Sequence, residues 1–392
     1  MAPDIPAGVL DDAPFYDSDF VTQTLDLFTH AATLTTLSDG SMMAAWFGGS
    51  REGARDVKIY GARFNPMTQE WGDNLVLAER DQTEQAVDRM IRKLGNPVLG
   101  QAPDGRLWLF YVSVSVGGWA GSAINYMVSD DLGANWSTPK RLITSPFFNV
   151  STLVRGNPVF HEDGSIGLPV YHESMGKFPE YLRLDRDGRI LDKARIDHGR
   201  RTLQPDVVAL SPTQAIAVLR YAGDPPNRMM ISESNASGMQ WSEPLVTEIA
   251  NPNSGLAAIR FDEDQILLAL NDLEKGRHRL SLFLADNNLR HWRRVKVLEQ
   301  SPRDGDHLPT DLFRQHIATE FLESDDDSHR NRLDDFLARL DKRMCEKEGC
   351  EFKYDYPYLT QSTDGRFHLI YTWNKSMIKH VTFNRAWLEQ AQ

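Results

Sequence analysis

The sequence of 392 residues predicts an all-β protein, a six-bladed β-propeller with a short α-helical insertion in its last blade. Three observations predict this fold class. A short phrase recurs six times, a second turn motif recurs in phase with it, and a charged helical segment lengthens the last interval. We expect one domain, residues 1–392, that holds the insertion at residues 301–350.

Each copy of the recurring phrase begins with a polar residue, which a proline usually follows. An apolar stretch, a tight turn and a second apolar stretch come next. Its clearest copy is Asn96-Pro97 before a turn at Asp104-Gly105. Copies recur at about 50 residues, the length of one four-stranded unit. The residues that head the six copies are His30, Asn96, Asn157, Gln204, Ser254 and Tyr356. Because the innermost strands of a propeller surround its axis, we expect these residues to ring the mouth of a central pocket.

The second motif is a turn of the type Ser-x-Asp-x-Gly-x-x-Trp, best preserved at residues 129–136. Its aspartate can bind backbone N–H groups and its glycine permits a left-handed bend, so we interpret it as a structural turn.

From about residue 301 to residue 349 the strand pattern stops, and a helical pattern replaces it. Leu333, Phe336, Leu337 and Leu340 lie on one face of the predicted helix. The insertion is expected to be a packed flank, an oligomer contact or a lid over the site that follows it.

A net charge of −12 argues against nucleic acid and anionic membranes as partners. No apolar stretch reaches the ~18 residues of a membrane-spanning helix. The N-terminus lacks the basic and apolar regions of a signal peptide. This predicts a cytoplasmic protein, or a periplasmic or secreted one if a leader has been removed. The oligomeric state is left open.

Cys345 and Cys350 are the two cysteines of the chain. Two ligands without a CxxC spacing argue against a metal site, whereas a local disulfide and two free thiols both stay open. The sequence contains no Walker, Rossmann or zinc signature, so we expect neither a metal nor an organic cofactor.

A glycine-rich loop at residues 47–56 follows the first inner strand and carries Arg51, Arg55 and Asp56. This loop, the turn motif and the phrases at residues 251–255 and 371–380 resemble the sialidase (neuraminidase) superfamily, in its branch with BNR or Asp-box repeats. The similarity covers nearly everything except the helical insertion, and it is more specific for the fold than for the substrate. It implies a sialidase-like propeller that cleaves a sugar whose anomeric carbon bears a carboxylate.

Sialidases use a tyrosine nucleophile activated by a glutamate, an aspartate as acid/base, and three arginines that hold the carboxylate. By this resemblance, Asp56 falls at the acid/base position and Tyr356 at the nucleophile position. The candidates to hold the carboxylate are Arg51, Arg220, Arg228 and, as a further arginine, Arg277 or Arg279.

Two positions depart from the family pattern. His30 stands where sialidases have their first clamping arginine, and Gln204 stands where they have the activating glutamate. Because glutamine cannot take a proton from tyrosine, Glu173 is the candidate replacement. Near the end of the chain, Lys379-His380 is expected to face solvent.

The first hypothesis is an exo-glycoside hydrolase that removes a terminal acidic 2-keto-3-deoxy sugar, such as sialic acid or Kdo, from a glycan. Tyr356 would be the nucleophile, Glu173 its base and Asp56 the acid, while Asn96, Asn157 and Gln204 would contact the substrate. The second hypothesis is a lyase or hydrolase acting on uronic-acid-capped glycans, in which His30 or Tyr356 abstracts a proton. The third is a non-catalytic propeller that binds glycan. The sequence does not determine the sugar or the linkage.

Overall fold

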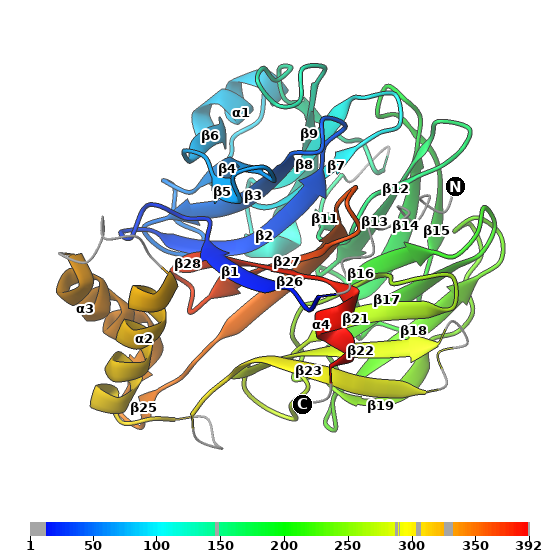
Figure 1. The fold of residues 1–392 in the computed structure, drawn as a ribbon. Coiled ribbons are helices and arrows are strands. Elements are labelled where there is room, and N and C mark those ends of the chain that lie inside the picture. The colour runs from blue at the N-terminus through cyan, green and yellow to red at the C-terminus, as the bar shows by residue number, and fades with distance from the viewer. Residues whose placement is uncertain are drawn as a thin grey trace.

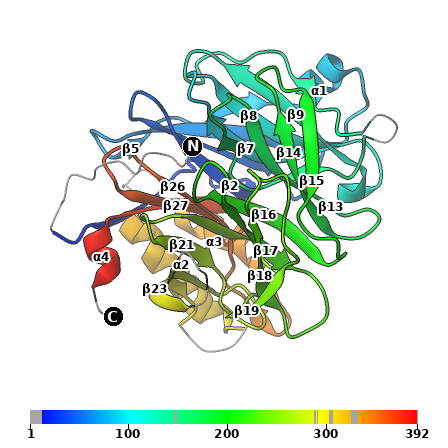
Figure 2. The ribbon, with the colours of Figure 1, turned by 90° about the vertical axis from the view of Figure 1, so that its right-hand side faces the viewer.

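The computed structural model describes residues 13–145, 149–286, 289, 291–302, 307–324 and 332–390. Its strands form six antiparallel sheets of four or five strands, placed around a central axis (Figures 1 and 2). The predicted six-bladed β-propeller is therefore confirmed. No helix among these residues is long and apolar enough to cross a membrane.

Within each blade the strands are antiparallel, and the first strand of the blade lies nearest the axis (Figure 2). The first blade contains β2 (Phe28–Thr36), β3 (Met42–Gly49), β4 (Lys58–Asn65), β5 (Glu70–Trp71) and β6 (Leu75–Ala78). The second contains β7 (Lys93–Gln101), β8 (Leu107–Val114), β9 (Ser122–Ser129) and β10 (Lys140–Arg141). The third contains β11 (Leu153–Val154), β12 (Val159–Phe160), β13 (Ile166–His172), β14 (Phe178–Leu184) and β15 (Ile190–Arg195).

The fourth blade contains β16 (Thr202–Ala209), β17 (Ala215–Tyr221), β18 (Arg228–Ser234) and β19 (Leu245–Ala250). The fifth contains β20 (Leu256–Arg260), β21 (Gln265–Leu270), β22 (Arg279–Asp286) and β23 (Trp292–Gln300). The sixth contains β26 (Tyr354–Gln361), β27 (Phe367–Trp373), β28 (Met377–Phe383) and β1 (Tyr16–Phe20). Short helices outside the blades are α1 (Arg80–Val87), the 3-10 turn Gly118–Gly121 and α4 (Arg385–Glu389).

The two ends of the chain meet in the sixth blade. β1 pairs with β28, and Tyr16 lies opposite Phe383 in their register (Figure 1). The N-terminal strand therefore supplies the outer strand of the last blade and closes the ring. The repeat pattern did not assign this strand.

Six hydrophobic clusters fill the spaces between neighbouring blades. The period of two along each strand sends alternate side chains to opposite faces of a sheet. In β8, Leu109 packs toward the first blade, while Trp108 and Phe110 pack toward the third. Strands buried on both faces explain why the apolar stretches of this sequence are continuous rather than alternating.

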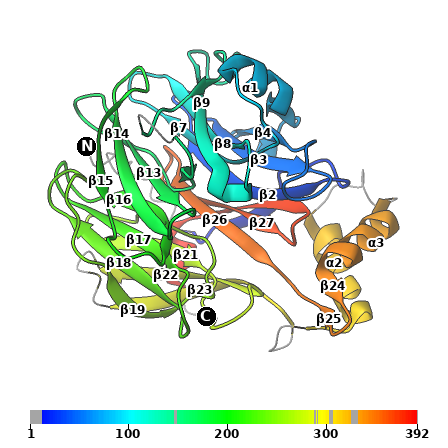
Figure 3. The same ribbon diagram turned by 180° about the vertical axis from the view of Figure 1, so that it is seen from behind.

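The helical insertion lies between β23 and β26. It consists of α2 (Thr310–Ser324), α3 (Leu333–Met344) and a hairpin of β24 (Cys345–Glu346) and β25 (Gly349–Cys350). Phe336, Leu337 and Leu340 are buried, as the helical pattern predicts, in a cluster that includes Phe20 of β1 and Trp373 of β27. Figure 3 shows the two helices beside the sixth blade, at the outer end of β26. The insertion is thus a packed flank of that blade.

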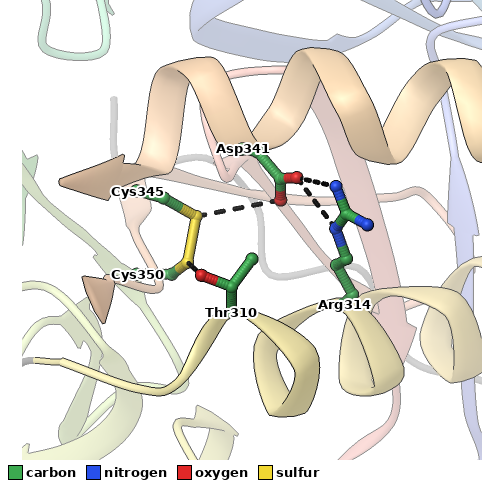
Figure 4. The surroundings of a disulfide bond; sticks show 5 residues. All are labelled: Thr310, Arg314, Asp341, Cys345 and Cys350. Carbon is green, nitrogen blue, oxygen red and sulfur yellow. Dashed lines mark hydrogen bonds and ion pairs between the residues drawn. A yellow bond between two sulfur atoms is a disulfide. The ribbon is translucent and has the colours of Figure 1, made fainter. Parts of the chain in front are cut away.

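A disulfide joins Cys345 and Cys350 across the small hairpin (Figure 4). The Thr310 hydroxyl lies 3.6 Å from the Cys350 sulfur, and Arg314 Nε donates to Asp341 Oδ2 at 2.8 Å. These contacts connect the start of α2 with the end of α3. The choice that the sequence left open between a disulfide and free thiols is settled in favour of the disulfide.

The turn motif at residues 129–136 makes local hydrogen bonds between β9 and β10. Asp131 Oδ1 accepts from the Asn135 amide at 2.8 Å, and Ser129 Oγ accepts from the Gly133 amide at 2.8 Å. Gly133 has a φ of 88°, which a residue with a side chain rarely adopts. These bonds agree with the structural interpretation of the motif.

The expectation that Lys379-His380 faces solvent is wrong. Lys379 is 7% exposed, because α2 covers its face of β28, and His380 is 2% exposed, because Phe64 and Trp71 of the first blade cover the other face. Lys379 Nζ lies 2.7 Å from Glu299 Oε1, and His380 Nδ1 accepts from Trp71 Nε1 at 3.2 Å. Both residues therefore belong to the packing of the sixth blade.

Candidate active site at the starts of the inner strands

Four inner strands carry a β-bulge near their start. The register of β2, β7, β16 and β26 with the next strand skips two residues in each case. The first skipped residue has a positive φ in all four strands: Ala31 (53°), Asn96 (43°), Gln204 (48°) and Tyr356 (55°). A bulge re-aims a side chain, and bulges are frequent next to active sites. The repeated phrase therefore encodes a repeated backbone distortion.

The bulge corrects the assignment of the first copy. Ala31, not His30, occupies the position that Asn96, Gln204 and Tyr356 share. His30 lies one residue earlier and is buried, and its ring meets the Tyr356 ring edge-on with centroids 4.7 Å apart. Burial lowers the pKa of His30 to about 3, although Asp355 opposes the shift. Its imidazole is therefore neutral at ordinary pH.

Gln204 lies between two tyrosine hydroxyl groups. Its Nε2 is 3.2 Å from Tyr171 Oη and 3.4 Å from Tyr356 Oη. Asn96 Nδ2 donates to the same Tyr171 oxygen at 3.1 Å. Four blades thus contribute to one hydrogen-bonded group, and its member Tyr356 is the half-buried one that solvent reaches.

Arg220 fixes the orientation of the Gln204 amide. Its Nη1 donates to Gln204 Oε1 at 2.9 Å, and its Nε donates to Asn253 Oδ1 at 2.6 Å. Because arginine has donors only, the oxygen of Gln204 must face Arg220 and the nitrogen must face the tyrosines. Tyr356 Oη therefore accepts a hydrogen bond from Gln204. This amide can stabilise negative charge on the phenol oxygen, but it cannot take the phenol proton.

A second arginine reaches the same region from the fifth blade. Arg277 Nη1 donates to Asp355 Oδ1 at 2.6 Å, and its Nη2 donates to the Asn253 carbonyl at 3.2 Å. Burial alone would raise the pKa of Asp355, but the charge and hydrogen bond of Arg277 outweigh it and bring the pKa to about 2. Asp355 is therefore a carboxylate that holds Arg277 beside Tyr356.

The backbone of the fifth blade approaches the Tyr356 ring closely. A Cβ atom at Gly255 would lie 2.8 Å from Tyr356 Cδ1. Real Cβ atoms do not come this near to another heavy atom, so the ring can occupy its place only beside a glycine. The phrase at residues 251–255 thus contributes both Asn253 and the space for Tyr356.

The loop at residues 50–56 places its acidic groups differently from the sequence-based prediction. Asp56 accepts from the Ser50 amide and the Ser50 hydroxyl, each at 2.9 Å, so its carboxylate fixes its own loop. Arg51 is exposed. Glu52 is also exposed, and its charge contributes to the raised pKa of Arg277, after the larger effect of Asp355.

Glu173 lies at the edge of this group. Burial raises the pKa of Tyr171 most, and the charges of Tyr356 and Glu173 raise it further. Glu173 is half-buried, and its amide donates to Ser151 Oγ at 3.0 Å. Nearby, the Lys93 ammonium lies 3.8 Å from the centre of the Trp119 ring.

Several residues predicted for the site lie elsewhere. Asn157 donates its amide N–H to Asp206 Oδ1 at 2.9 Å and lines an axial cavity of about 480 Å³. The second halves of the inner strands line this cavity, which lies at the opposite end of the axis from Tyr356. Arg228 pairs with Glu274, and Arg279 pairs with Asp272. Ser254 of the predicted ring is fully buried and accepts from Asn251 Nδ2 at 3.2 Å. The predicted ring of six is thus reduced to Asn96, Gln204 and Tyr356, with His30 beside them.

Sequence reasoning missed Tyr171, Asn253 and Asp355. Tyr171 lies two residues before Glu173, so the alternation of a strand could have placed both on one face. Asn253 and Asp355 directly precede Ser254 and Tyr356, which the repeat pattern had singled out. Within the described ranges, no group of three or more His, Cys, Asp and Glu side chains is placed to hold a metal ion.

The chain belongs to the family of BNR repeat-like domains, whose model matches residues 40–369. It is similar to a solved protein of unknown function from Dyadobacter fermentans, with 12% identity over 94% of this chain and 98% of that one and a TM-score of 0.66. It is also similar to the intramolecular trans-sialidase from Ruminococcus gnavus, solved in complex with oseltamivir carboxylate. Here the identity is 14%, the match covers 93% of this chain and 96% of that one, and the TM-score is 0.63.

A third similar structure is the α-L-arabinanase of Penicillium chrysogenum complexed with arabinobiose, with 14% identity, coverage of 97% and 100%, and a TM-score of 0.59. No curated protein matches the sequence. At such identities the likeness shows the fold. The predicted membership in the sialidase-like BNR superfamily is confirmed at this level.

Proposed function

We propose that the protein is a glycan-processing enzyme that removes a terminal acidic sugar, of the sialic acid or Kdo type, by hydrolysis. The observation that carries this proposal is the half-buried Tyr356 phenol, which accepts a hydrogen bond from Gln204 and lies beside two arginines. A neutral phenol suits an anomeric carbon that bears a carboxylate, because an anionic nucleophile would be repelled.

The arginines are the proposed carboxylate clamp. A guanidinium has five N–H donors, and the bonds described for Arg220 use two of them. Arg277 is held in place by Asp355 from one side and by the Asn253 carbonyl from the other. A planar carboxylate bound by both arginines would place the anomeric carbon over Tyr356.

In the proposed reaction, Tyr356 Oη attacks the anomeric carbon and its proton passes to Glu173. Gln204 stabilises the negative charge that develops on the phenol oxygen. The bond to the leaving oxygen breaks as an acid protonates that oxygen. Water then hydrolyses the tyrosyl–sugar bond and releases the free sugar.

The acid comes from the loop at residues 50–56. The family resemblance assigns this role to Asp56, but Ser50 engages that carboxylate. Glu52 is exposed, and its charge acts on Arg277. We therefore propose Glu52 as the acid and Asp56 as the residue that holds the loop. The variants Glu52→Gln and Asp56→Asn separate the two roles, because loss of the acid spares substrates with a good leaving group whereas loss of the loop does not.

A lyase acting on uronic-acid-capped glycans is the second candidate. It is favoured by the same Gln204 orientation, because an amide donor and an arginine can neutralise a carboxylate while a tyrosine or a neutral histidine removes the adjacent proton. Tyr356 is the better candidate for this base, because a pKa of about 3 makes the neutral imidazole of His30 a weak proton acceptor.

One experiment tests both candidates. The protein is incubated with oligosaccharides capped by sialic acid, Kdo or hexuronic acid, and released sugars are separated and identified by mass. Hydrolysis adds the mass of water and gives a free ulosonic acid, whereas elimination gives an unsaturated product that absorbs in the near ultraviolet. Tyr356→Phe should abolish release, and the matched control Tyr126→Phe, remote from the site, should not. Binding without release from any glycan would contradict an enzymatic function.

A further inference from the structure

Arg155 is a buried arginine that the reaction described above does not use. It follows β11 of the third blade and is 4% exposed. Burial lowers its pKa, although the charges of Tyr358, Tyr356 and Asp206 oppose this. Removing a guanidinium from water is unfavourable, so the contacts of Arg155 must offset a large penalty.

Those contacts lie on the other side of the axis. Arg155 Nη2 donates to the carbonyl oxygen of Tyr356 at 2.8 Å and to that of Pro357 at 3.0 Å. The guanidinium carbon lies 5.3 Å from the centre of the Tyr356 ring and 5.1 Å from that of Tyr358. The third and sixth blades face each other across a ring of six, so this side chain spans the centre of the propeller.

The local sequence allows this crossing. A Cβ atom at Gly156 would lie 2.1 Å from the Pro205 carbonyl oxygen, so only glycine lets the chain approach β16 here. Asp206 then receives the Asn157 amide on one oxygen and the Ala258 amide on the other, each at 2.9 Å. Residues 155–157 are thus held against the fourth and fifth blades while Arg155 reaches the sixth.

Tyr356 needs such a partner. Its φ of 55° is unfavourable for a residue with a side chain, and Tyr356 and Pro357 stand outside the register of β26 with β27. Their carbonyl groups therefore require a donor from elsewhere. Arg155 supplies it to both.

The charge of Arg155 is only partly compensated. Among the described residues, no acceptor pairs with its Nε or its Nη1. A buried cation is stabilised by the face of an aromatic ring, and the Tyr356 ring is one of the neighbours of Arg155.

We propose that Arg155 is a positioning residue for Tyr356. It holds the Tyr356-Pro357 bulge in its strained conformation, and so keeps the phenol in place beside Gln204. The inference rests on the proposed function of Tyr356, but half of its test does not require a substrate.

The test compares Arg155→Met and Arg155→Lys with the parent protein. Amide hydrogen exchange of the peptide that contains residues 354–361 reports on the bulge without a substrate. In Arg155→Met this peptide is expected to exchange about tenfold faster, because the carbonyl groups of Tyr356 and Pro357 lose their donor. Arg155→Lys keeps one donor and should exchange at a rate between those of Arg155→Met and the parent. Arg183→Met is the matched control and should change nothing. It removes another arginine of the third blade, one that donates to Asp163.

Kinetics on the released sugar give the second readout. Arg155→Met should lower kcat on the order of 100-fold at nearly unchanged KM, since the nucleophile is misplaced but the carboxylate clamp is kept. Arg155→Lys should also lower kcat, because an ammonium cannot bridge two carbonyls as a planar guanidinium does. If Arg155→Met does not fold, Arg155→Lys decides.

A folded Arg155 variant with parental kcat and parental hydrogen exchange at residues 354–361 would overturn the inference. If the parent releases no sugar from any glycan, the proposed function fails, and the hydrogen exchange alone then decides the role of Arg155.

Discussion

Replacing Glu320 by glutamine should remove a pH-dependent weakness in the contact between the helical insertion and the propeller. Glu320 lies on α2, and its Oε2 accepts from Trp373 Nε1 at 2.8 Å. The same oxygen is 3.9 Å from Lys379 Nζ, which is more closely paired with Glu299 at 2.7 Å. Two carboxylates therefore share one lysine. Burial, and next the charge of Glu299, raise the pKa of Glu320 from 4.5 to about 7.

The sign of the effect follows from where the proton is held more tightly. Between pH 4.5 and about 7 the folded protein keeps a proton on Glu320 that the unfolded chain has lost. The free energy of unfolding therefore falls as pH rises through this window. This rise in the pKa of Glu320 lowers the free energy of unfolding by at most about 3 kcal/mol once the pH exceeds the pKa in the folded protein. Glutamine keeps an oxygen acceptor for Trp373 and cannot ionise.

Urea unfolding followed by tryptophan fluorescence at pH 5 and pH 8 measures this effect. Glu320→Gln should match the parent at pH 5 and exceed its stability at pH 8 by up to about 3 kcal/mol. Glu248→Gln, at an exposed position on β19, is the matched control and should follow the parent at both pH values. An equal difference between Glu320→Gln and the parent at pH 5 and pH 8 would refute the reasoning.

Two further predictions concern the candidate site. Gln204→Leu would remove the amide donor to the Tyr356 oxygen, so sugar release should fall on the order of 100-fold, and parental activity would contradict the role given to Gln204. Asp355→Asn would leave the partly buried Arg277 without its carboxylate and should destabilise the protein by about 3 kcal/mol in urea unfolding at pH 7. Because the pKa of Asp355 is lowered to about 2, the stability from this pair is full above pH 4 and declines as pH falls toward 2. Asp355→Asn should lose that acid dependence, and a variant as stable and as acid-sensitive as the parent would count against the pair.

The blades were predictable because each depends on local signals. Turn residues, apolar stretches and spacing recur within about 50 residues, and this repeat implies the propeller. The closing strand β1 gave no comparable signal, since Tyr16–Phe20 pairs with a strand more than 350 residues away in the chain. Such long-range pairing is set by the closure of the ring rather than by the residues of the strand itself.

The site was predictable only in part, because its geometry depends on bulges. The prolines after Asn96, Gln204 and Tyr356 mark the bulged position correctly. Ala31 carries the same distortion without a following proline, so the more conspicuous His30 was assigned in its place. Asn157 is followed by a proline but does not have a positive φ, and it lines the axial cavity instead of the site around Tyr356.

Charged residues were the hardest to place. Whether an arginine holds a substrate or a structural carboxylate depends on partners from other blades, as for Arg228 with Glu274 and Arg277 with Asp355. Periodicity places such residues on a strand, but it does not choose their partners.

Covalent labelling of the phenol tests the central claim most directly. The released sugar is converted to a fluorinated glycosyl fluoride, which forms a long-lived bond with a tyrosine nucleophile, and the labelled peptide is located by mass spectrometry. The account predicts one label, on Tyr356, and none in the Tyr356→Phe variant. A label on another residue, or sugar release that continues at the parental rate in Tyr356→Phe, would contradict it.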